Sequence, residues 1–243
     1  MVYLRQIGSV VCFDFLQIGA KPLQSKALYK ILNFGSSSKR HVMAKYTYKN
    51  AASKMRLYDD QGRRLYLNET ERNDFLLASY QLPLDERSFC MFLLHTGCRL
   101  SEARFMRFED VQVNEQIVTI KTLKRRKPHY RDLHIPKALA MTLEEQMSSG
   151  DPDRIYLWSE TPRPPPRPNC YRLIKRVMKQ IGVKGPRASP KGLRHAFGVH
   201  AVMKGIQIHI LQMWMGHADM TTTARYAKAI GEDERRLAKR LWE

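Results

Sequence analysis

Residues 189–195 read SPKGLRH, and this stretch fixes the start of the clearest helix in the chain. Serine at position 189 followed by Pro190 is typical of a helix start, because a serine oxygen accepts from free backbone N–H groups and proline suits the first helical position. We expect this helix to reach Gly205. Apolar spacing predicts three further helices downstream, over residues 208–215, 222–229 and 232–242.

Upstream of this stretch, helical patterns alternate with short strands. Asn68 followed by Glu71 resembles a capping box that opens a helix. More helices are expected over residues 85–95, 100–107, 137–147 and 170–181. Two strands are expected among the β-branched residues of 111–120, with a third over residues 130–135 and a proline-rich loop over 162–168. The predicted fold class is mainly α with a small antiparallel β-sheet (α+β).

The chain is strongly basic. Its 243 residues contain 42 Lys and Arg against 23 Asp and Glu, which gives a formal net charge of +19. Cations on this scale favour a polyanionic partner, since each neutralised phosphate releases a counterion. Because 43% of the residues are hydrophobic, the chain can also form a core. These features favour a folded protein that binds nucleic acid, although ribosomal proteins, membrane-surface proteins and many nucleases share such a charge.

Several classes of protein do not fit the sequence. The four cysteines form no C-x-x-C pair, which argues against a zinc ribbon, and no residue set has the spacing typical of a metal site. No apolar run approaches the roughly 18 residues that a membrane span needs. We expect a cytoplasmic protein without a metal, a cofactor or a membrane partner.

The N-terminal part, residues 1–66, has weaker patterning than the rest. It combines short apolar pieces with many basic residues and a Gly-Ser-Ser-Ser segment at residues 35–38. Two interpretations stay open. Residues 1–66 form an atypical N-terminal segment or a truncated DNA-binding arm, or Met43 is the true start and residues 1–42 are an artefact. In either case we expect the catalytic domain to span residues 67–243.

Four short segments carry the chemistry. They are TGCRLSE at residues 96–102, TLK at 122–124 in a predicted hairpin that ends at 135–136, KGLRH at 191–195, and MGH at 215–217. Tyr226 follows the histidine of the last segment by nine positions. Each segment alone is a weak signal, but the four together, with a tyrosine near the C-terminus, are specific.

This set resembles the catalytic domain of the tyrosine recombinase (phage integrase) family over roughly residues 67–243, and looks most like short plasmid-type resolvases and integrases. The resemblance implies the DNA breaking-rejoining fold. It also implies a site-specific recombinase that forms a 3′-phosphotyrosine intermediate without metal or ATP, for integration, excision or resolution of a mobile element or plasmid. Family members act as homotetramers on two DNA sites, and an accessory DNA-binding protein would be compatible with this.

The resemblance assigns roles to the motif residues. Arg99 and Arg194 would clamp the phosphate oxygens, since a guanidinium stays charged and fits phosphate bidentately. Tyr226 would be the nucleophile of this phosphoryl transfer. His217 would bind the phosphate or orient the tyrosine, and Glu102, one turn after Arg99, would hold that arginine.

The proton-transfer groups are less well defined. Lys124 is the predicted general acid for the leaving oxygen, with Lys121 as the alternative. The family often has a histidine where this chain has Lys191, which leaves the identity of the proton acceptor open. His195 we interpret as a packing or supporting residue. Along the DNA backbone near the cleavage site we expect contacts from Arg125, Arg126 and Lys127.

Two other functions compete with a recombinase. A type IB topoisomerase uses the same nucleophile and phosphate clamp, and would relax plasmids without a specific site. A DNA-binding protein that has lost activity would explain both Lys191 and the lack of a recognisable core-binding domain in residues 1–66. The small size of the chain and its resemblance to plasmid-type resolvases argue against the topoisomerase. The complete set of arginines, lysine, histidine and tyrosine argues against a protein that has lost activity.

Overall fold

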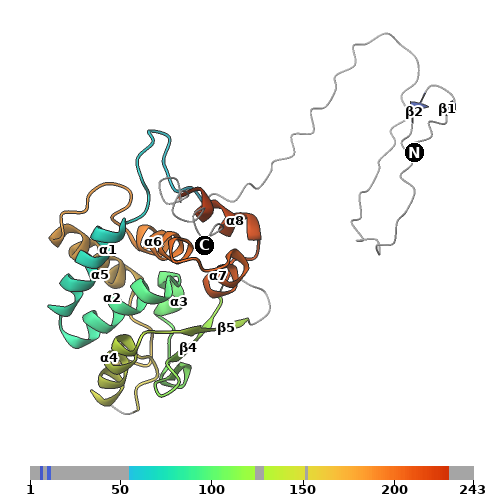
Figure 1. The fold of residues 1–243 in the computed structure, drawn as a ribbon. Helices are drawn as coiled ribbons and strands as arrows, with labels where there is room; N and C mark the ends of the chain where they lie inside the picture. The colour runs from blue at the N-terminus through green and yellow to red at the C-terminus, as the bar shows by residue number, and fades with distance from the viewer. Residues whose placement is uncertain (1–5, 8–9, 12–54, 124–128, 151–152, 230–243) are drawn as a thin grey trace, which may run out of the picture. The chain divides into compact units, whose positions relative to one another are not determined.

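The computed structural model describes residues 6–7, 10–11, 55–123, 129–150 and 153–229 (Figure 1). The chain divides into two compact units, residues 1–48 and 49–243. In the first unit, β1 (Gln6–Ile7) pairs antiparallel with β2 (Val10–Val11). All candidate site residues belong to the second unit.

Helix α1 (Glu69–Tyr80) begins where the sequence predicts it. The Asn68 side chain accepts from the Glu71 backbone N–H at 2.8 Å, and the Glu71 carboxylate accepts from the Asn68 N–H at 3.0 Å. These two bonds form the predicted capping box, which satisfies two N–H groups that the first helical turn leaves free.

Helix α2 (Leu84–Thr96) is the central helix of the unit. All six residues from Phe89 to Leu94 are buried, and α1, α4 (Lys137–Ser148) and α6 (Pro190–Met203) pack against it. The helix ends at Gly97, whose φ of 57° is left-handed and costs glycine little. The chain can therefore turn sharply there, and α3 starts within four residues.

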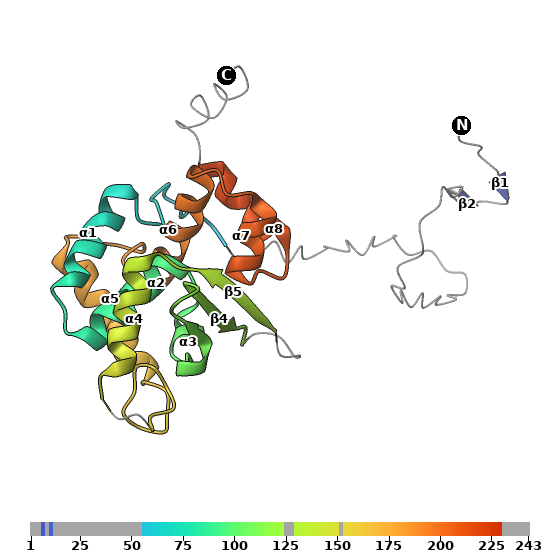
Figure 2. The same cartoon turned by 60° about the horizontal axis from the view of Figure 1, so that its bottom comes forward.

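The predicted antiparallel sheet is present. Its strands β3 (Val111–Gln112), β4 (Ile117–Lys121) and β5 (Tyr130–His134) lie in that order. Val118 pairs with Leu133, and Ile120 pairs with Arg131. All four of these side chains are buried, so this face of the sheet packs on the protein interior. Figure 2 shows β4 beside α3 (Leu100–Ala103), with which it is in contact.

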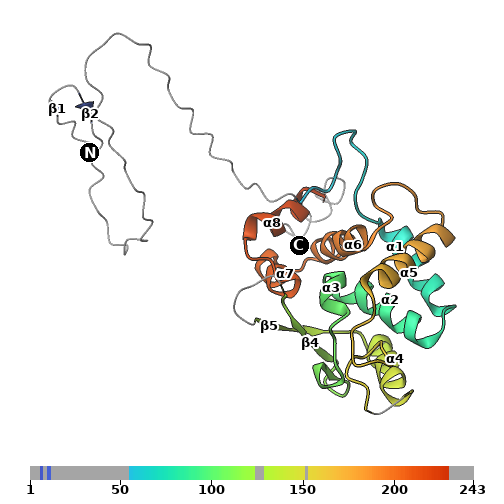
Figure 3. The same cartoon turned by 180° about the vertical axis from the view of Figure 1, so that it is seen from behind.

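The C-terminal helices build a second layer. They are α5 (Arg167–Gln180), α6, α7 (Ile208–Met215), α8 (Met220–Ala224) and the 3₁₀ helix η2 (Arg225–Ala229). The α6 helix contacts α2 on one side and both α7 and η2 on the other, an arrangement that Figure 3 shows from behind. Ser189 caps α6 as predicted, accepting from the Gly192 N–H, with Pro190 in the first turn.

Several boundaries differ from the predictions. α3 ends at Ala103 instead of Arg107, because i→i−3 bonds from the Phe105 and Met106 N–H groups turn the chain away from helical geometry. The helix expected over residues 222–229 is split into α8 and η2. α5 begins inside the predicted proline-rich loop, which is tolerated because proline fits a first helical turn. The helix predicted over residues 232–242 lies outside the described residues.

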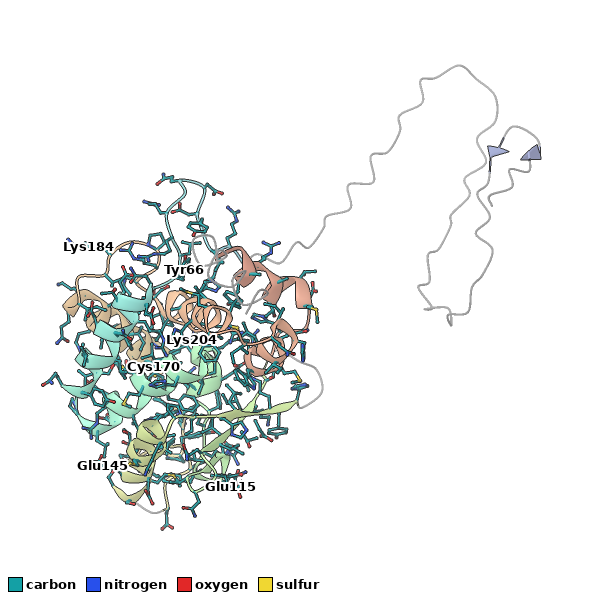
Figure 4. All side chains as sticks on the ribbon, viewed as in Figure 1. Tyr66, Glu115, Glu145, Cys170, Lys184 and Lys204 are labelled. Carbon is teal, nitrogen blue, oxygen red and sulfur yellow. The ribbon has the colours of Figure 1, made fainter. Side chains whose placement is uncertain are left out.

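Two hydrophobic clusters form the core. The larger surrounds α2, and the smaller joins α6, α7 and Tyr226 to Met55, Leu57 and Tyr66. Figure 4 shows Tyr66 beside α6, with Glu145 and Glu115 toward the end formed by α4 and the sheet. The domain boundary at residue 67 stays a prediction. None of the described helices combines the length and apolarity needed to cross a membrane.

Candidate active site

An open pocket of about 810 Å³ lies where α3, α6 and the turn after α7 meet. Four of the predicted site residues line it: Arg99, Lys191, Arg194 and His217. The structure thus brings together segments that are up to 118 positions apart in the sequence, from residue 99 to residue 217. The described residues contain no group of three His, Cys, Asp or Glu side chains that could hold a metal ion.

Arg99 stands at the N-terminus of α3 and is fixed by Glu102. Its guanidinium donates to Glu102 Oε1 at 2.8 Å, and its backbone N–H donates to Oε2 at 3.0 Å. The Arg99 side chain is 25% exposed, whereas that of Glu102 is 1% exposed. The buried glutamate thus holds the arginine on its interior side. The remaining guanidinium N–H groups stay available to an anion in the pocket.

Arg131, on β5, supports this pair from the protein interior. Its three side-chain nitrogens donate to Glu102 Oε2 at 2.6 Å, to Thr122 Oγ1 at 2.8 Å and to the Trp214 carbonyl at 2.7 Å. Burial raises the pKa of Glu102, but the charge of Arg131 and the hydrogen bonds from Arg99 and Arg131 outweigh it, so the pKa lies below its usual value. Glu102 is therefore a carboxylate that bridges two arginines.

Arg194, on α6, is the second predicted clamp residue and is buried. It donates to the Gly97 carbonyl at 2.8 Å and to the Met215 carbonyl at 2.7 Å, which lie at the C-terminal ends of α2 and α7. Both helix ends carry partial negative charge, which favours a cation there. Burial, with Arg99 nearby, lowers the pKa of Arg194 to about 10, so the guanidinium is charged at neutral pH.

Tyr226, the predicted nucleophile, lies in η2 and is fully buried. Its hydroxyl is 3.0 Å from His195 Nδ1, and its ring packs against Gly198 of α6. A Cβ at position 198 would lie 2.5 Å from the ring, so only glycine leaves room for the phenol. Burial raises the pKa of Tyr226 to about 12 against the opposing charges of Arg194 and Arg99. The hydroxyl is thus protonated and held behind the pocket.

His217 follows the left-handed turn at Gly216 and is partly exposed at the pocket. Its ring is nearly parallel to that of Tyr226, at an angle of 11° and 6.3 Å between centroids, and its Nδ1 is 2.9 Å from Thr223 Oγ1. Burial, with the charge of Arg194 next in importance, lowers the pKa of His217 to about 3. The imidazole is therefore neutral in the free protein.

The structure places the predicted lysines only in part. Lys191 is exposed at the pocket, on the first turn of α6. Lys121, at the end of β4, lies with its ammonium 5.8 Å from the Tyr130 ring centroid. Lys124 and the predicted DNA-contacting residues Arg125, Arg126 and Lys127 lie outside the described residues.

Sequence reasoning missed two residues that contact the predicted site residues, and it did not predict one contact of a third. Arg131 could have been found, because in a strand that alternates in and out it points the same way as Leu133. Gly198 gave no signal. His195 was interpreted as packing or supporting, and the structure shows that it contacts the phenol directly.

Taken together, the pocket offers two guanidinium groups and two neutral imidazoles beside a buried phenol. Residues 57–232 match the model of the phage integrase family. The chain belongs to the phage integrase family. The match covers all the predicted site residues. The family's fold, expected from the motifs, is confirmed by the described helices and sheet and by the solved structures that follow.

Individual relatives agree. Tyrosine recombinase XerA of Pyrococcus furiosus is 28% identical over 175 residues, which cover 72% of this chain and 60% of the relative. A crystal structure of XerA recombinase superposes with a TM-score of 0.60 at 23% identity, covering 70% of this chain and 65% of that one. The Tn1549 transposon integrase in complex with circular intermediate DNA gives a TM-score of 0.58 at 18% identity, covering 73% and 68%. The chain thus spans about three fifths of the XerA sequence that it matches.

Proposed function

We propose that this integrase-family chain is a tyrosine-type site-specific DNA recombinase that cleaves DNA through a covalent 3′-phosphotyrosine at Tyr226 and rejoins it by the reverse step. One juxtaposition supports this most. Arg99, Arg194 and His217 line a single pocket, and the Tyr226 phenol lies behind it against His217. A phosphodiester in that pocket would be next to both its clamp and its nucleophile.

The groups divide the work of a phosphoryl transfer. The phenol oxygen attacks phosphorus, and the bond to the 5′-oxygen of the next nucleotide breaks. Arg99 and Arg194 stabilise the charge that spreads over the non-bridging oxygens, which is where such a reaction gains most from the protein. Both arginines are already held by Glu102 or by helix-end carbonyls, so little reorganisation is needed when the phosphate binds.

Protonation of the leaving 5′-oxygen is assigned to Lys124, with Lys121 as the alternative. Lys191, exposed at the pocket edge, adds a positive charge toward the bound phosphate. Arg125, Arg126 and Lys127 are assigned to the DNA backbone near the cut. The reaction conserves the energy of the phosphodiester in the phosphotyrosine link, so religation needs neither ATP nor a metal.

The proposed partner is double-stranded DNA, bound by a homotetramer on two sites, with an accessory DNA-binding protein as a further partner. The net charge of +19 supports a DNA partner. The Tn1549 transposon integrase, whose fold is similar, was solved with circular intermediate DNA. This supports a role in integration, excision or resolution of a mobile element or plasmid.

The test is adduct formation on nicked suicide duplexes, in which the cut strand loses a short fragment and cannot be rejoined. The wild type should form a protein–DNA adduct that resists denaturant. Tyr226→Phe should bind the same DNA and form none. Tyr171→Phe is the matched control, because Tyr171 is an exposed tyrosine lining the same pocket. Adduct in the Tyr226→Phe variant would refute the assignment of the nucleophile.

The general acid has its own test. Lys124→Ala should cut ordinary DNA slowly and recover on a 5′-phosphorothiolate substrate, whose sulfur leaves without an acid. Lys121→Ala, measured in parallel, should be affected less and should gain little from the sulfur. If Lys121→Ala shows the slow cutting and the recovery instead, the role belongs to Lys121.

A further inference from the structure

The Tyr226 hydroxyl has one hydrogen-bond partner among the described residues. This is Nδ1 of His195, 3.0 Å away, on the helix that also carries Arg194. The other nearby imidazole, His217, has its Nδ1 at Thr223 Oγ1 instead. The contact is buried on both sides, since His195 is 4% exposed and Tyr226 0%. Water therefore does not compete for this phenol proton in the free protein.

His195 also faces the phosphate pocket, as one of its lining residues. Lys191 and His195 are four positions apart on α6, so their side chains are neighbours on one helix face. A lysine ammonium has donors but no lone pair to accept a proton. His195 thus offers an acceptor nitrogen where Lys191, one turn earlier, offers only positive charge.

We infer that His195 accepts the proton of the Tyr226 hydroxyl as that oxygen attacks the DNA phosphate. The inference rests on the proposed function and adds a catalytic residue to it. The proton passes from Tyr226 Oη to His195 Nδ1 while the Oη–phosphorus bond forms and the phosphorus–5′-oxygen bond breaks. The leaving oxygen takes its proton from the general acid. In religation the imidazolium returns its proton to the phenol, which restores the free enzyme.

The electrostatics around His195 favour this role once DNA is bound. Burial, with the charges of Lys191 and Arg194, lowers the pKa of His195 to about 3, so the free imidazole is neutral. The other groups facing it are the phenol of Tyr226 and the neutral imidazole of His217. A phosphate in the pocket brings a negative charge that offsets the two cations. The imidazole is then more basic at the moment when attack makes the phenol proton acidic.

The second ring nitrogen of His195 supports the same conclusion. Nε2 is buried and has no hydrogen-bond partner among the described residues. When Nδ1 accepts from the phenol, Nε2 carries the hydrogen, and a buried unpaired N–H costs about 1–3 kcal/mol. A phosphate oxygen in the pocket that His195 lines would supply the missing acceptor. The bound substrate would then hold the imidazole in the tautomer that the reaction needs.

Access to the phenol requires one movement. Tyr226 is fully buried, so a phosphate can reach its oxygen only after a side chain at the pocket edge shifts. Of the two histidines there, His217 is partly exposed and His195 is buried. His217 makes its hydrogen bond to Thr223, so a shift of His217 would leave the bond between Tyr226 and His195 in place.

The experiment compares His195→Gln with the wild type on a pool of nicked duplexes whose sequence beside the nick is randomised. Glutamine can hydrogen-bond the phenol but cannot take its proton. We expect adduct formation to slow by about 100-fold or more, with DNA binding within about two-fold of the wild type. The wild-type rate should rise with pH and reach a plateau, and the variant should lose that plateau. His200→Gln, on the same helix and away from the pocket, is the matched control and should react like the wild type.

Each outcome decides between alternatives. Wild-type speed in His195→Gln would refute the inference while leaving the recombinase intact. Faster reaction would show that His195 holds the tyrosine back, which also refutes it. Absence of any adduct with the wild type, or an adduct in Tyr226→Phe, would contradict the proposed function itself.

A spectroscopic measurement keeps the inference testable if His195→Gln fails to fold. Nitrogen-15 NMR of histidine-labelled full chain should show His195 with hydrogen on Nε2 and a bare, hydrogen-bonded Nδ1. That Nδ1 signal should shift in Tyr226→Phe and stay in Tyr171→Phe. Hydrogen on Nδ1 of the wild type would overturn the assignment.

Discussion

The two sides of the pocket hold their polar groups in different ways. On one side, which we call the sheet side, Arg99 and Glu102 of α3 and Arg131 of β5 carry full charges. Ion pairs at 2.6–2.8 Å hold these three side chains together. On the other side, formed by α6, η2 and the turn after α7 and called the helix side below, the side chains of Tyr226, His195 and His217 are neutral. Burial opposes the charged form of each. Two cations of α6 lie on that side: Arg194 is buried and bonded to backbone carbonyls, and Lys191 is exposed at the pocket.

This difference matches the role that the proposed function gives to each side. A clamp for a phosphate needs permanent charge in a fixed place, and paired carboxylates keep arginines charged and oriented. A nucleophile and its proton acceptor must change protonation during the reaction, so they cannot be tied into permanent ion pairs. Stability of the sheet side should therefore depend on charge pairing, and stability of the helix side on packing and on pH.

The largest expected effect comes from breaking the sheet side with Arg131→Met. It leaves the buried Glu102 with only Arg99, and loss of one partner of a buried pair costs about 3–5 kcal/mol. Urea unfolding measures this cost. Arg176→Met removes the mostly exposed pair with Glu86 and should cost about 0–1 kcal/mol. Equal costs for the two variants would mean that the buried network is no more important than a surface pair.

On the helix side, Gly198→Ala should act through packing. The new methyl would lie 2.5–2.7 Å from three carbons of the Tyr226 ring, and such overpacking costs about 1–3 kcal/mol. Alanine favours helix by about 1 kcal/mol, which offsets part of this. Adduct formation should fall because the phenol is displaced. In a Tyr226→Leu background Gly198→Ala should cost much less, and an unchanged cost there would exclude the ring as the cause.

The pH dependence of stability separates the two sides. The pKa of His195 falls from 6.5 to about 3 on folding, so the unfolded chain binds more protons and stability decreases as pH drops below 6.5. Glu102 has a lowered pKa, so its contribution is kept above 4.5 and lost only at lower pH. His195→Gln should therefore flatten the fall in unfolding free energy between pH 6.5 and 4.5, by at most about 1.4 kcal/mol per pH unit.

Two partly buried histidines set the background for that measurement. His95 and His200 have pKa values lowered mainly by burial, so part of the slope should remain in His195→Gln. An identical slope in His195→Gln and the wild type would contradict the neutral, buried imidazole.

The smallest expected effect concerns the helix cap that positions the pocket. Ser189→Ala removes the acceptor for the Gly192 N–H and should cost about 1 kcal/mol. Asn68→Ala removes the cap of α1 at a similar cost. Because Ser189 lies at the pocket and Asn68 does not, only Ser189→Ala should also slow adduct formation. Equal slowing by both would point to general destabilisation.

What could be predicted from the sequence was mostly local. The caps at Asn68 and Ser189, the turn at Gly97 and the strand alternation each depend on residues within one turn of each other, and the structure confirms them. The early end of α3 was missed because tight i→i−3 bonds after Ala103 leave no mark in the apolar pattern.

The contacts that the sequence did not predict join distant residues. Arg131 meets Glu102 across 29 positions, and His195 meets Tyr226 across 31. A charged residue in a strand and a histidine beside an arginine are ordinary in a basic chain, so neither stands out alone. Motif resemblance predicts Arg99, Arg194, His217 and Tyr226 as site residues because the proposed chemistry restricts those residue types, and the structure brings the four together, whereas the supporting contacts can be built in many ways.

Arg194 joins the ends of two helices that no other described side chain joins in this way, since its guanidinium bonds both the Gly97 and the Met215 carbonyls. The same residue is thus a structural cross-link as well as a proposed phosphate ligand. A relative that binds DNA without cutting it would still gain this cross-link from the arginine. When related sequences are sorted into active and inactive enzymes, this arginine is therefore a poor criterion. The phenol is a far better one, because the fold needs only its ring.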